Sequence, residues 1–235
     1  MRFPCLLMLA LLAAAPSSGD ASASLSGAVA PSLAPSETIP PERFAAATQQ
    51  LYARRDVAAL QRLCGGATGE ADLLCRYRLF PLTQDESLIA NLPVAAPTPT
   101  ARGNALLSGL WGYRAARAPL LRVPAYGGRS LDLLRRARAL DARDPFVLLV
   151  DGQSLLFRPA IAGGDRRAAL ARFRALQGIV GAAPGEGVAP MEADLWVWFA
   201  LFRAGDRTAA DLHARLLARN PPPLYRDFLL HPPRA

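Results

Sequence analysis

The sequence contains no lysine, and its 27 basic residues are all arginine. It also holds only two histidines and three cysteines. A chain without lysine cannot supply the lysine of a nucleotide-binding P-loop, and the histidine positions do not form an HExxH zinc motif. No dinucleotide-binding fingerprint follows a strand pattern. These absences exclude several common enzyme classes.

The remaining catalytic patterns are incomplete. The Gly-Gln-Ser run ending at Ser154 lacks the second glycine of a nucleophile elbow and lies within an apolar helical segment. A glycosidase-type carboxylate pair would require Asp151, Glu192 and Asp194 to converge in space. His213 is expected to pack in or beside the core. We therefore expect no enzymatic activity, no catalytic residue, no metal site and no cofactor.

Aromatic residues are few, at 7%, and the 51% apolar content is carried mainly by Ala and Leu. Ala and Leu are strong helix formers, whereas the strand-favouring residues Ile and Val are sparse. Charged residues make up 20% of the chain, which leaves enough apolar material for a packed core. The composition predicts an all-α protein.

The net charge of +8 raises the question of an anionic partner, such as nucleic acid or a lipid headgroup surface. The arginines are spread along several segments, are interleaved with Asp, and never exceed two in a row. A nucleic-acid interface normally clusters its charge. Coding bias toward Arg is the favoured explanation, and no nucleic-acid partner is expected.

The first residues have the pattern of a cleavable signal peptide. One Arg precedes the apolar run 5–15, which is about half of the ~20 residues that a membrane-spanning helix needs. Small residues follow, and Ala21-Ser22-Ala23 suits a signal peptidase. The sequence predicts a signal peptide over 1–23, a flexible linker over 24–41, a periplasmic or secreted chain and no stable membrane insertion. A buried N-terminal helix is the alternative.

Two cysteines remain after this cleavage, Cys64 and Cys75. In an oxidising compartment, two thiols eleven positions apart are good candidates for a disulfide, because turn residues between them let the chain double back. Two separate buried thiols are the alternative. No histidine or third cysteine lies nearby to suggest a metal site.

The segment 42–92 is expected to form an N-terminal helical cap. Pro41 and Glu42 favour a helix start, and Asp56 marks a turn between two helices. A further helix is expected over 70–79, ending ahead of Pro81.

The strongest pattern is an internal repeat. The segments are GGRSLDLLRRARAL (127–140), GGDRRAALARFRAL (163–176) and GDRTAADLHARLL (205–217), which follow the apolar segments 101–117, 145–157 and 191–203. Each unit is an apolar helix, a glycine-containing turn and an amphipathic helix. Asp165 and Asp206 stand where helix N-caps are needed. A loop over 178–190 separates the second unit from the third.

This pattern resembles the tetratricopeptide repeat (TPR), whose units are 34-residue helical hairpins. In the middle unit, Gly152 matches the small position of the first helix, and Ala169, Phe173 and Leu176 match packing positions of the second. In the other two units, the comparable residues are Gly109, Trp111 and Ala137, then Trp198, Ala209, Leu216 and Pro221. The resemblance implies an α-solenoid of about three hairpins over 100–222, with a C-terminal capping helix and tail over 223–235. A generic helical bundle is the alternative.

The resemblance also implies a concave face lined by the first helix of each hairpin. We expect that face to bind a protein or peptide partner, with contacts from Trp111, Arg114, Gln153, Trp196 and Phe202. A periplasmic small-molecule carrier with an apolar pocket is the alternative function, and the chain is compatible with a monomer. Trp196 and Trp198 are two positions apart on one helix, so one of them is expected near solvent or a partner.

Overall fold

The computed structural model describes residues 40–183 and 187–233, and within them the protein is all-α, without a strand. The helices are α1 (Pro41–Arg54), α2 (Val57–Cys64), α3 (Gly69–Thr83), α4 (Ser87–Ala90), α5 (Ala101–Arg117), α6 (Val123–Leu140), α7 (Pro145–Phe157), α8 (Arg166–Ala182), α9 (Pro190–Ala204), α10 (Thr208–Ala218) and α11 (Pro223–Leu230). The predicted signal peptide and nearly all of the predicted linker lie outside the described residues. No described helix is long and apolar enough to span a bilayer.

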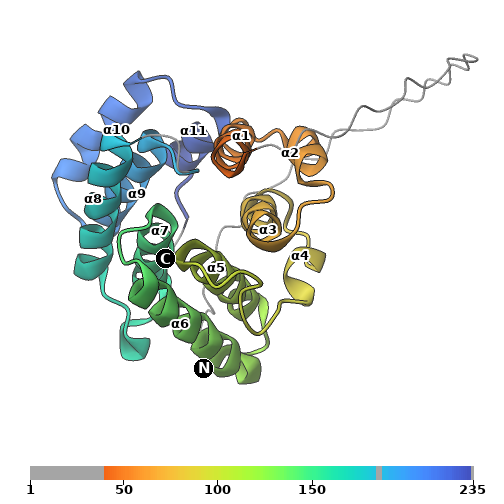
Figure 1. The fold of residues 1–235 in the computed structure, drawn as a ribbon. Helices are drawn as coiled ribbons and strands as arrows, with labels where there is room; N and C mark the ends of the chain where they lie inside the picture. The colour runs from red at the N-terminus through yellow and green to blue at the C-terminus, as the bar shows by residue number, and fades with distance from the viewer. Residues whose placement is uncertain (1–39, 184–186, 234–235) are drawn as a thin grey trace, which may run out of the picture.

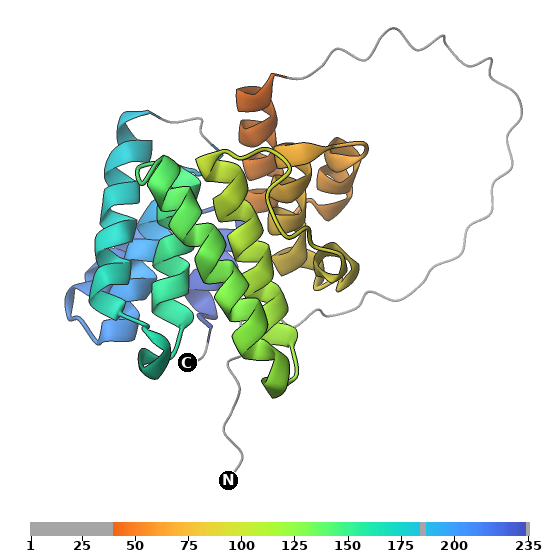
Figure 2. The ribbon, with the colours of Figure 1, turned by 60° about the horizontal axis from the view of Figure 1, so that its bottom comes forward.

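The helices curve around a common centre, so that the two ends of the described chain meet (Figure 1). Helices α5 and α6, α7 and α8, and α9 and α10 form three successive hairpins, two of which stand side by side in Figure 2. The C-terminal α11 packs against α1. Gln49 donates a hydrogen bond of 2.7 Å to the Tyr225 hydroxyl, and Arg55 pairs with Asp227 at 3.2 Å. These contacts close the curved array across its open side.

The three predicted hairpin units are present, and their first helices match the predicted spans to within one residue. The prediction of a glycine-containing turn in the first unit is wrong, because Gly127 and Gly128 lie inside α6. The chain reverses earlier, through a 3-10 turn at Leu120–Arg122, and Pro124 then stands in the first turn of α6 where its missing N–H is harmless.

The turn of the second unit does require its glycines. Gly163 adopts a φ of +87°, a left-handed conformation that residues with a Cβ rarely take. A Cβ on Gly164 would lie 1.9 Å from the carbonyl oxygen of Arg158. Asp165 then accepts hydrogen bonds from the backbone N–H groups of Arg167 and Ala168, which confirms the predicted N-cap. Asp206 accepts from the N–H and hydroxyl of Thr208, the first residue of α10, but the N-cap position is Arg207, so the predicted cap at Asp206 is wrong by one residue.

Two predicted helix ends are also wrong. Helix α3 continues through Pro81 to Thr83, because a proline in the last turn removes one backbone hydrogen bond close to the point where the helix ends anyway. Helix α8 continues to Ala182 into the predicted loop 178–190, because Val180 is fully buried and holds the extra turn against the core.

The sulfur atoms of Cys64 and Cys75 lie 2.04 Å apart, at disulfide distance, and join the end of α2 to α3. Closing so short a loop restricts the unfolded chain, and we expect the bond to contribute about 2–3 kcal/mol. Urea unfolding of the oxidised chain and of the Cys64→Ser/Cys75→Ser variant measures this difference. Equal free energies of unfolding would contradict it.

Both tryptophans of α9 are buried, so the expectation that one of them meets solvent is wrong. Trp196 stacks on Phe173 of α8, with ring centroids 5.5 Å apart. The ring centroid of Trp198 lies 5.1 Å from that of His213 of α10 and 5.6 Å from that of Phe202. Helix α9 is covered on more than one side, because α8, α10 and α11 all pack against it. Two indoles that point in different directions are therefore both enclosed.

Candidate functional site

The centre of the curved array contains a pocket of about 50 Å³. Its walls come from α1, α3, α5, α7, α9 and α11, and from Gln84 just after α3. The lining residues are Tyr52, Tyr77, Arg78, Phe80, Pro81, Gln84, Tyr113, Gln153, Phe157, Glu192, Leu195, Trp196, Leu224, Tyr225 and Phe228. A cavity of this size holds a few water molecules or a small organic group, since one water needs ~10–15 Å³. Aromatic rings make up most of the wall.

A buried ion pair lies in the pocket wall. Arg78 of α3 and Glu192 of α9 are only 1% and 3% exposed, and they form two hydrogen bonds of 2.6 and 3.0 Å. Arg78 also donates to the carbonyl oxygen of Gly187 at 2.8 Å. Burial alone would lower the pKa of Arg78, but the charge and hydrogen bonds of Glu192 outweigh it and raise that pKa. The Arg78 guanidinium is thus held charged inside the protein.

One polar atom of this pair is left over. The Nε atom of Arg78 is buried and has no hydrogen-bond partner in the described structure. The guanidinium carbon of Arg78 lies 4.5 Å from the ring centre of Tyr52 and 5.5 Å from that of Phe146. Cation–π contacts of this kind offset part of the desolvation of a buried cation. The unpartnered Nε–H is available to a hydrogen-bond acceptor.

Tyrosine hydroxyls and amides supply the other polar groups. The Tyr77 hydroxyl donates to Oε1 of Gln153 at 2.7 Å. The Tyr225 hydroxyl, which accepts from Gln49, lies 3.5 Å from the carboxylate of Glu192. Hydrogen bonds therefore run from α1 through α11 and α9 to α3, and they connect the closure of the array with its central ion pair.

Four of the five tyrosines are expected to ionise only at unusually high pH. Burial raises the pKa of Tyr52 to about 12 and also raises the pKa values of Tyr77, Tyr113 and Tyr225. Between pH 10 and about 12 the folded chain keeps protons that the unfolded chain has lost, so stability is complete below pH 10 and falls above it. Near-UV absorbance of tyrosinate checks this.

The unfolded chain in urea is the reference for that titration. Its tyrosines should ionise near their ordinary pKa, whereas the folded chain should release these four protons only as it unfolds in alkali. Ionisation of all five tyrosines near pH 10 in a chain that stays folded would contradict the burial of the pocket wall.

The structure brings together two of the five predicted partner-binding residues. Gln153 and Trp196 both line the pocket. Trp111 and Arg114 lie elsewhere, beside Tyr126 of α6, and Trp111 Nε1 donates to the carbonyl oxygen of Pro93 at 3.2 Å. Phe202 is partly exposed near the end of α9. The five predicted partner-binding residues therefore lie in three separate regions of the structure and do not form one shared surface.

The carboxylates considered for catalysis do not converge. Asp151 is buried and binds Arg138 and Arg172, whereas Asp194 accepts from Gln177 at 2.7 Å and pairs with Arg219. Glu192 is occupied by Arg78. In the described part of the chain, no group of three His, Cys, Asp or Glu side chains could hold a metal ion.

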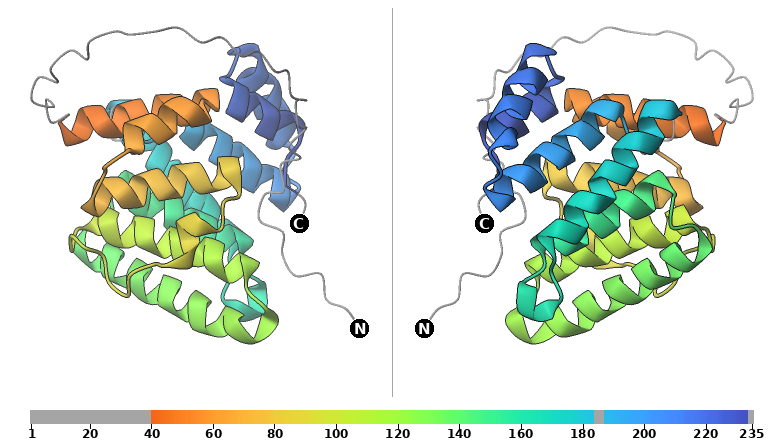
Figure 3. Two further views of the ribbon diagram at one scale, coloured as in Figure 1. Left: turned by 90° about the vertical axis from the view of Figure 1, so that its right-hand side faces the viewer. Right: turned by 90° about the vertical axis from the view of Figure 1, so that its left-hand side faces the viewer.

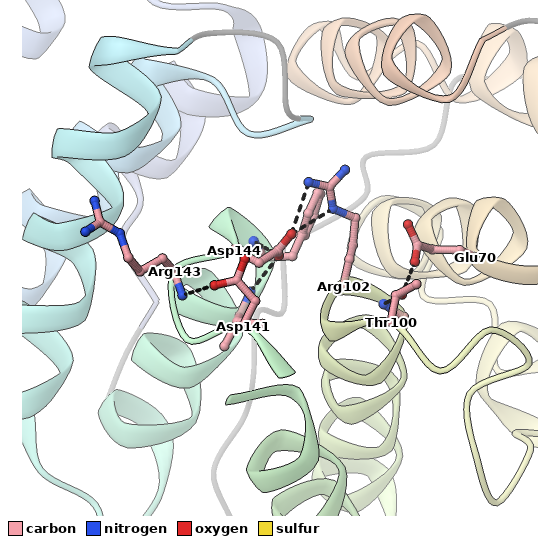
Figure 4. A network of polar contacts seen from close by, with 9 residues as sticks. Glu70, Thr100, Arg102, Asp141, Arg143 and Asp144 are labelled. Atoms are coloured by element: carbon pink, nitrogen blue, oxygen red, sulfur yellow. Dashed lines mark hydrogen bonds and ion pairs between the residues drawn. The ribbon is translucent and has the colours of Figure 1, made fainter. Parts of the chain in front are cut away.

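A second polar network joins the N-terminal ends of three helices (Figure 4). Asp144 caps α7 by accepting from two backbone N–H groups, and Arg102 of α5 donates to the same carboxylate at 3.1 and 3.2 Å. Burial raises the pKa of Asp144, and the charge of Arg102 opposes that rise. The Thr100 hydroxyl donates to Glu70, so this network joins α3, α5 and α7. The charged and polar side chains of this network bind one another and the backbone, and they hold the ends of the helices together.

Known proteins offer no assignment for this site, since no protein-family model, no curated protein and no solved structure matches the chain. The sequence reasoning missed Arg78 and the tyrosines, and it considered Glu192 only as part of a carboxylate pair. A signal existed, because Arg78 and Glu192 each stand in a helix whose other residues are mostly apolar. The arrangement has the character of a binding pocket, with aromatic walls and a few fixed polar groups.

Proposed function

We propose that the protein is an exported helical-repeat protein, a TPR-like solenoid closed on itself, that binds a small molecule in its central pocket. The observation that carries the proposal is the pocket itself, because six helices from different parts of the chain contribute side chains to it. The three hairpins support the repeat assignment, and the Cys64–Cys75 pair supports an oxidising compartment.

The geometry favours the carrier function over the peptide-binding function. A peptide laid along a concave face needs an open groove, and in the described residues α11 packs across the open side of the array against α1. What lies inside is a pocket of about 50 Å³. A small ligand can occupy such a space, and a larger one requires the helices to separate.

The pocket wall defines the chemistry of the ligand. Aromatic rings such as Phe80, Phe157 and Trp196 favour a flat or apolar group. Because Arg78 and Glu192 already neutralise each other, the pocket carries no net charge that would favour an ion. Tyrosine hydroxyls, Gln153 and the free Nε–H of Arg78 favour a neutral ligand with one hydrogen-bonding group.

Phenol and indole carry the ring and the hydrogen-bonding group that the wall favours, and because both are larger than the space of about 50 Å³, their binding requires the helices to separate. Ligand-observed NMR with the full chain measures this binding. We expect saturable binding that Leu195→Phe abolishes, because a larger side chain fills the pocket. Leu230→Phe makes the same change at an exposed position of α11 and should leave binding unchanged. Absence of binding, or binding that Leu195→Phe does not alter, would overturn the proposal.

Export has its own test. If residues 1–23 are a signal peptide, the chain recovered from the cell envelope should begin at Ser24 and carry no free thiol at Cys64 or Cys75. N-terminal sequencing and thiol labelling of the recovered chain measure both. An intact Met1 in a chain that stays in the cytoplasm would refute export. The ligand-binding experiment tests the pocket separately.

A further inference from the structure

The turns inside the three hairpins lie along one side of the molecule (Figure 3), and large apolar side chains at these turns are exposed. We define the turn edge as residues 120–122, 158–167 and 202–207. Ile161 is 99% exposed and Leu121 is 95% exposed, and Leu120 and Phe202 add to them. These four are the majority of the seven exposed large hydrophobic residues in the described chain. The other three, Val94, Leu140 and Leu230, are not part of the turn edge.

Short 3-10 turns hold these side chains outward. Leu120 and Leu121 lie in the turn Leu120–Arg122, and Ile161 lies at the same place in the second hairpin, in the turn Ala160–Ala162. Arg166 then donates to the carbonyl oxygen of Arg203 at 3.1 Å, which joins the second turn to the third. Ile161 therefore stands on a turn that is joined to the turn of the third hairpin.

The same edge gathers positive charge. It contains six arginines, at positions 122, 158, 166, 167, 203 and 207, and two aspartates, Asp165 and Asp206. Both aspartates accept hydrogen bonds at the start of a helix. None of the six arginines forms an ion pair within the described residues, which is also true of several arginines elsewhere, such as Arg43 and Arg129. What distinguishes the turn edge is that six such arginines stand on three turns.

The arginines that are scattered in the sequence thus include an unpaired group that is concentrated in space. Burial and then the nearby charge of Arg166 lower the pKa of Arg203, as expected where like charges approach each other. A bilayer surface has anionic headgroups above apolar acyl chains. Exposed apolar side chains are complementary to the acyl chains, and the arginines around them are complementary to the headgroups.

We propose that the turn edge is a peripheral membrane-binding surface that recognises anionic lipid headgroups. Leu120, Leu121 and Ile161 enter the boundary between headgroups and acyl chains, and the arginines contact the phosphates. This surface shares no residue with the wall of the central pocket. It orients the protein on a membrane without any helix crossing it.

Co-sedimentation of the full chain with vesicles tests this proposal, using phosphatidylcholine alone and phosphatidylcholine mixed with phosphatidylglycerol. We expect binding to the anionic vesicles that weakens as salt rises. Leu121→Ser/Ile161→Ser should weaken it at least about tenfold, because two apolar side chains no longer leave water. Arg122→Ser/Arg207→Ser should weaken it by about tenfold at low salt.

Leu140→Ser is the matched control, since Leu140 is exposed at the opposite end of α6 and should tolerate the change without loss of binding. The apolar run 5–15 is common to all variants, so differences between them report on the turn edge alone. Equal binding by Leu121→Ser/Ile161→Ser and the parent chain would overturn the proposal. So would a dimer, seen by ultracentrifugation, that the same double substitution dissociates, because the edge would then serve a second copy.

Discussion

Replacing Arg78 with Met should lower the free energy of unfolding by about 3–5 kcal/mol, one of the largest effects of any single substitution in this chain. The loss comes mainly from Glu192, a residue that is 3% exposed and whose carboxylate would lose the two hydrogen bonds and the charge that now compensate its burial. Glu192→Gln leaves the guanidinium without its counter-charge and should cost a similar amount. Urea unfolding followed by circular dichroism measures both changes.

The double substitution Arg78→Met/Glu192→Leu separates this explanation from a loss of packing. Removing both charges removes the penalty, so the double variant should recover most of the lost stability. Arg76→Met provides the control on the same helix, since its pair with Asp72 at 2.9 Å is partly exposed and should contribute less than about 1 kcal/mol. A double variant as unstable as the two single changes added together would show that the two side chains contribute independently, through packing, and would contradict this explanation.

The helices of this protein could be predicted from the sequence because their start and stop signals are local. Asp144 and Pro145 begin α7, and Pro159 follows its end, so the predicted span 145–157 agrees with the structure. Asp165 caps α8 as expected. Paired glycines failed as a turn signal at 127–128, because glycine permits a turn without requiring one.

The pocket could not be predicted in the same way, because it depends on contacts between distant segments. Gln49 and Tyr225 are 176 positions apart, and Arg78 and Glu192 are 114 apart. Nothing in the repeat pattern requires α11 to return to α1, and that return turns a concave face into a pocket. The same closure explains why Gln153 and Trp196 line the pocket while Trp111, which also stands on the first helix of a hairpin, contacts the segment before α5 instead.

The close approach of α7 to α8 gives the second large expected effect. A Cβ on Gly152 would lie 2.4 Å from Cε1 of Phe173, a fully buried ring that stacks on Trp196 in the pocket wall. Gly152→Ala should therefore cost about 1–3 kcal/mol through overpacking, although alanine favours a helix over glycine. Phe173→Ala should cost about 3–5 kcal/mol by opening a cavity.

Because the two residues occupy the same space, their effects should not add. In the Phe173→Ala background the new methyl group of Gly152→Ala enters the vacated volume, so it should be neutral or stabilising, and the coupling should reach about 1–3 kcal/mol. Gly128→Ala is the control, since no atom lies within 4 Å of a Cβ there and helix propensity should stabilise the chain by up to about 1 kcal/mol. Thermal and urea unfolding of the four variants measure these terms. Additive effects of Gly152→Ala and Phe173→Ala would show that α7 and α8 adjust their separation freely, and the contact between them would then not define the pocket wall.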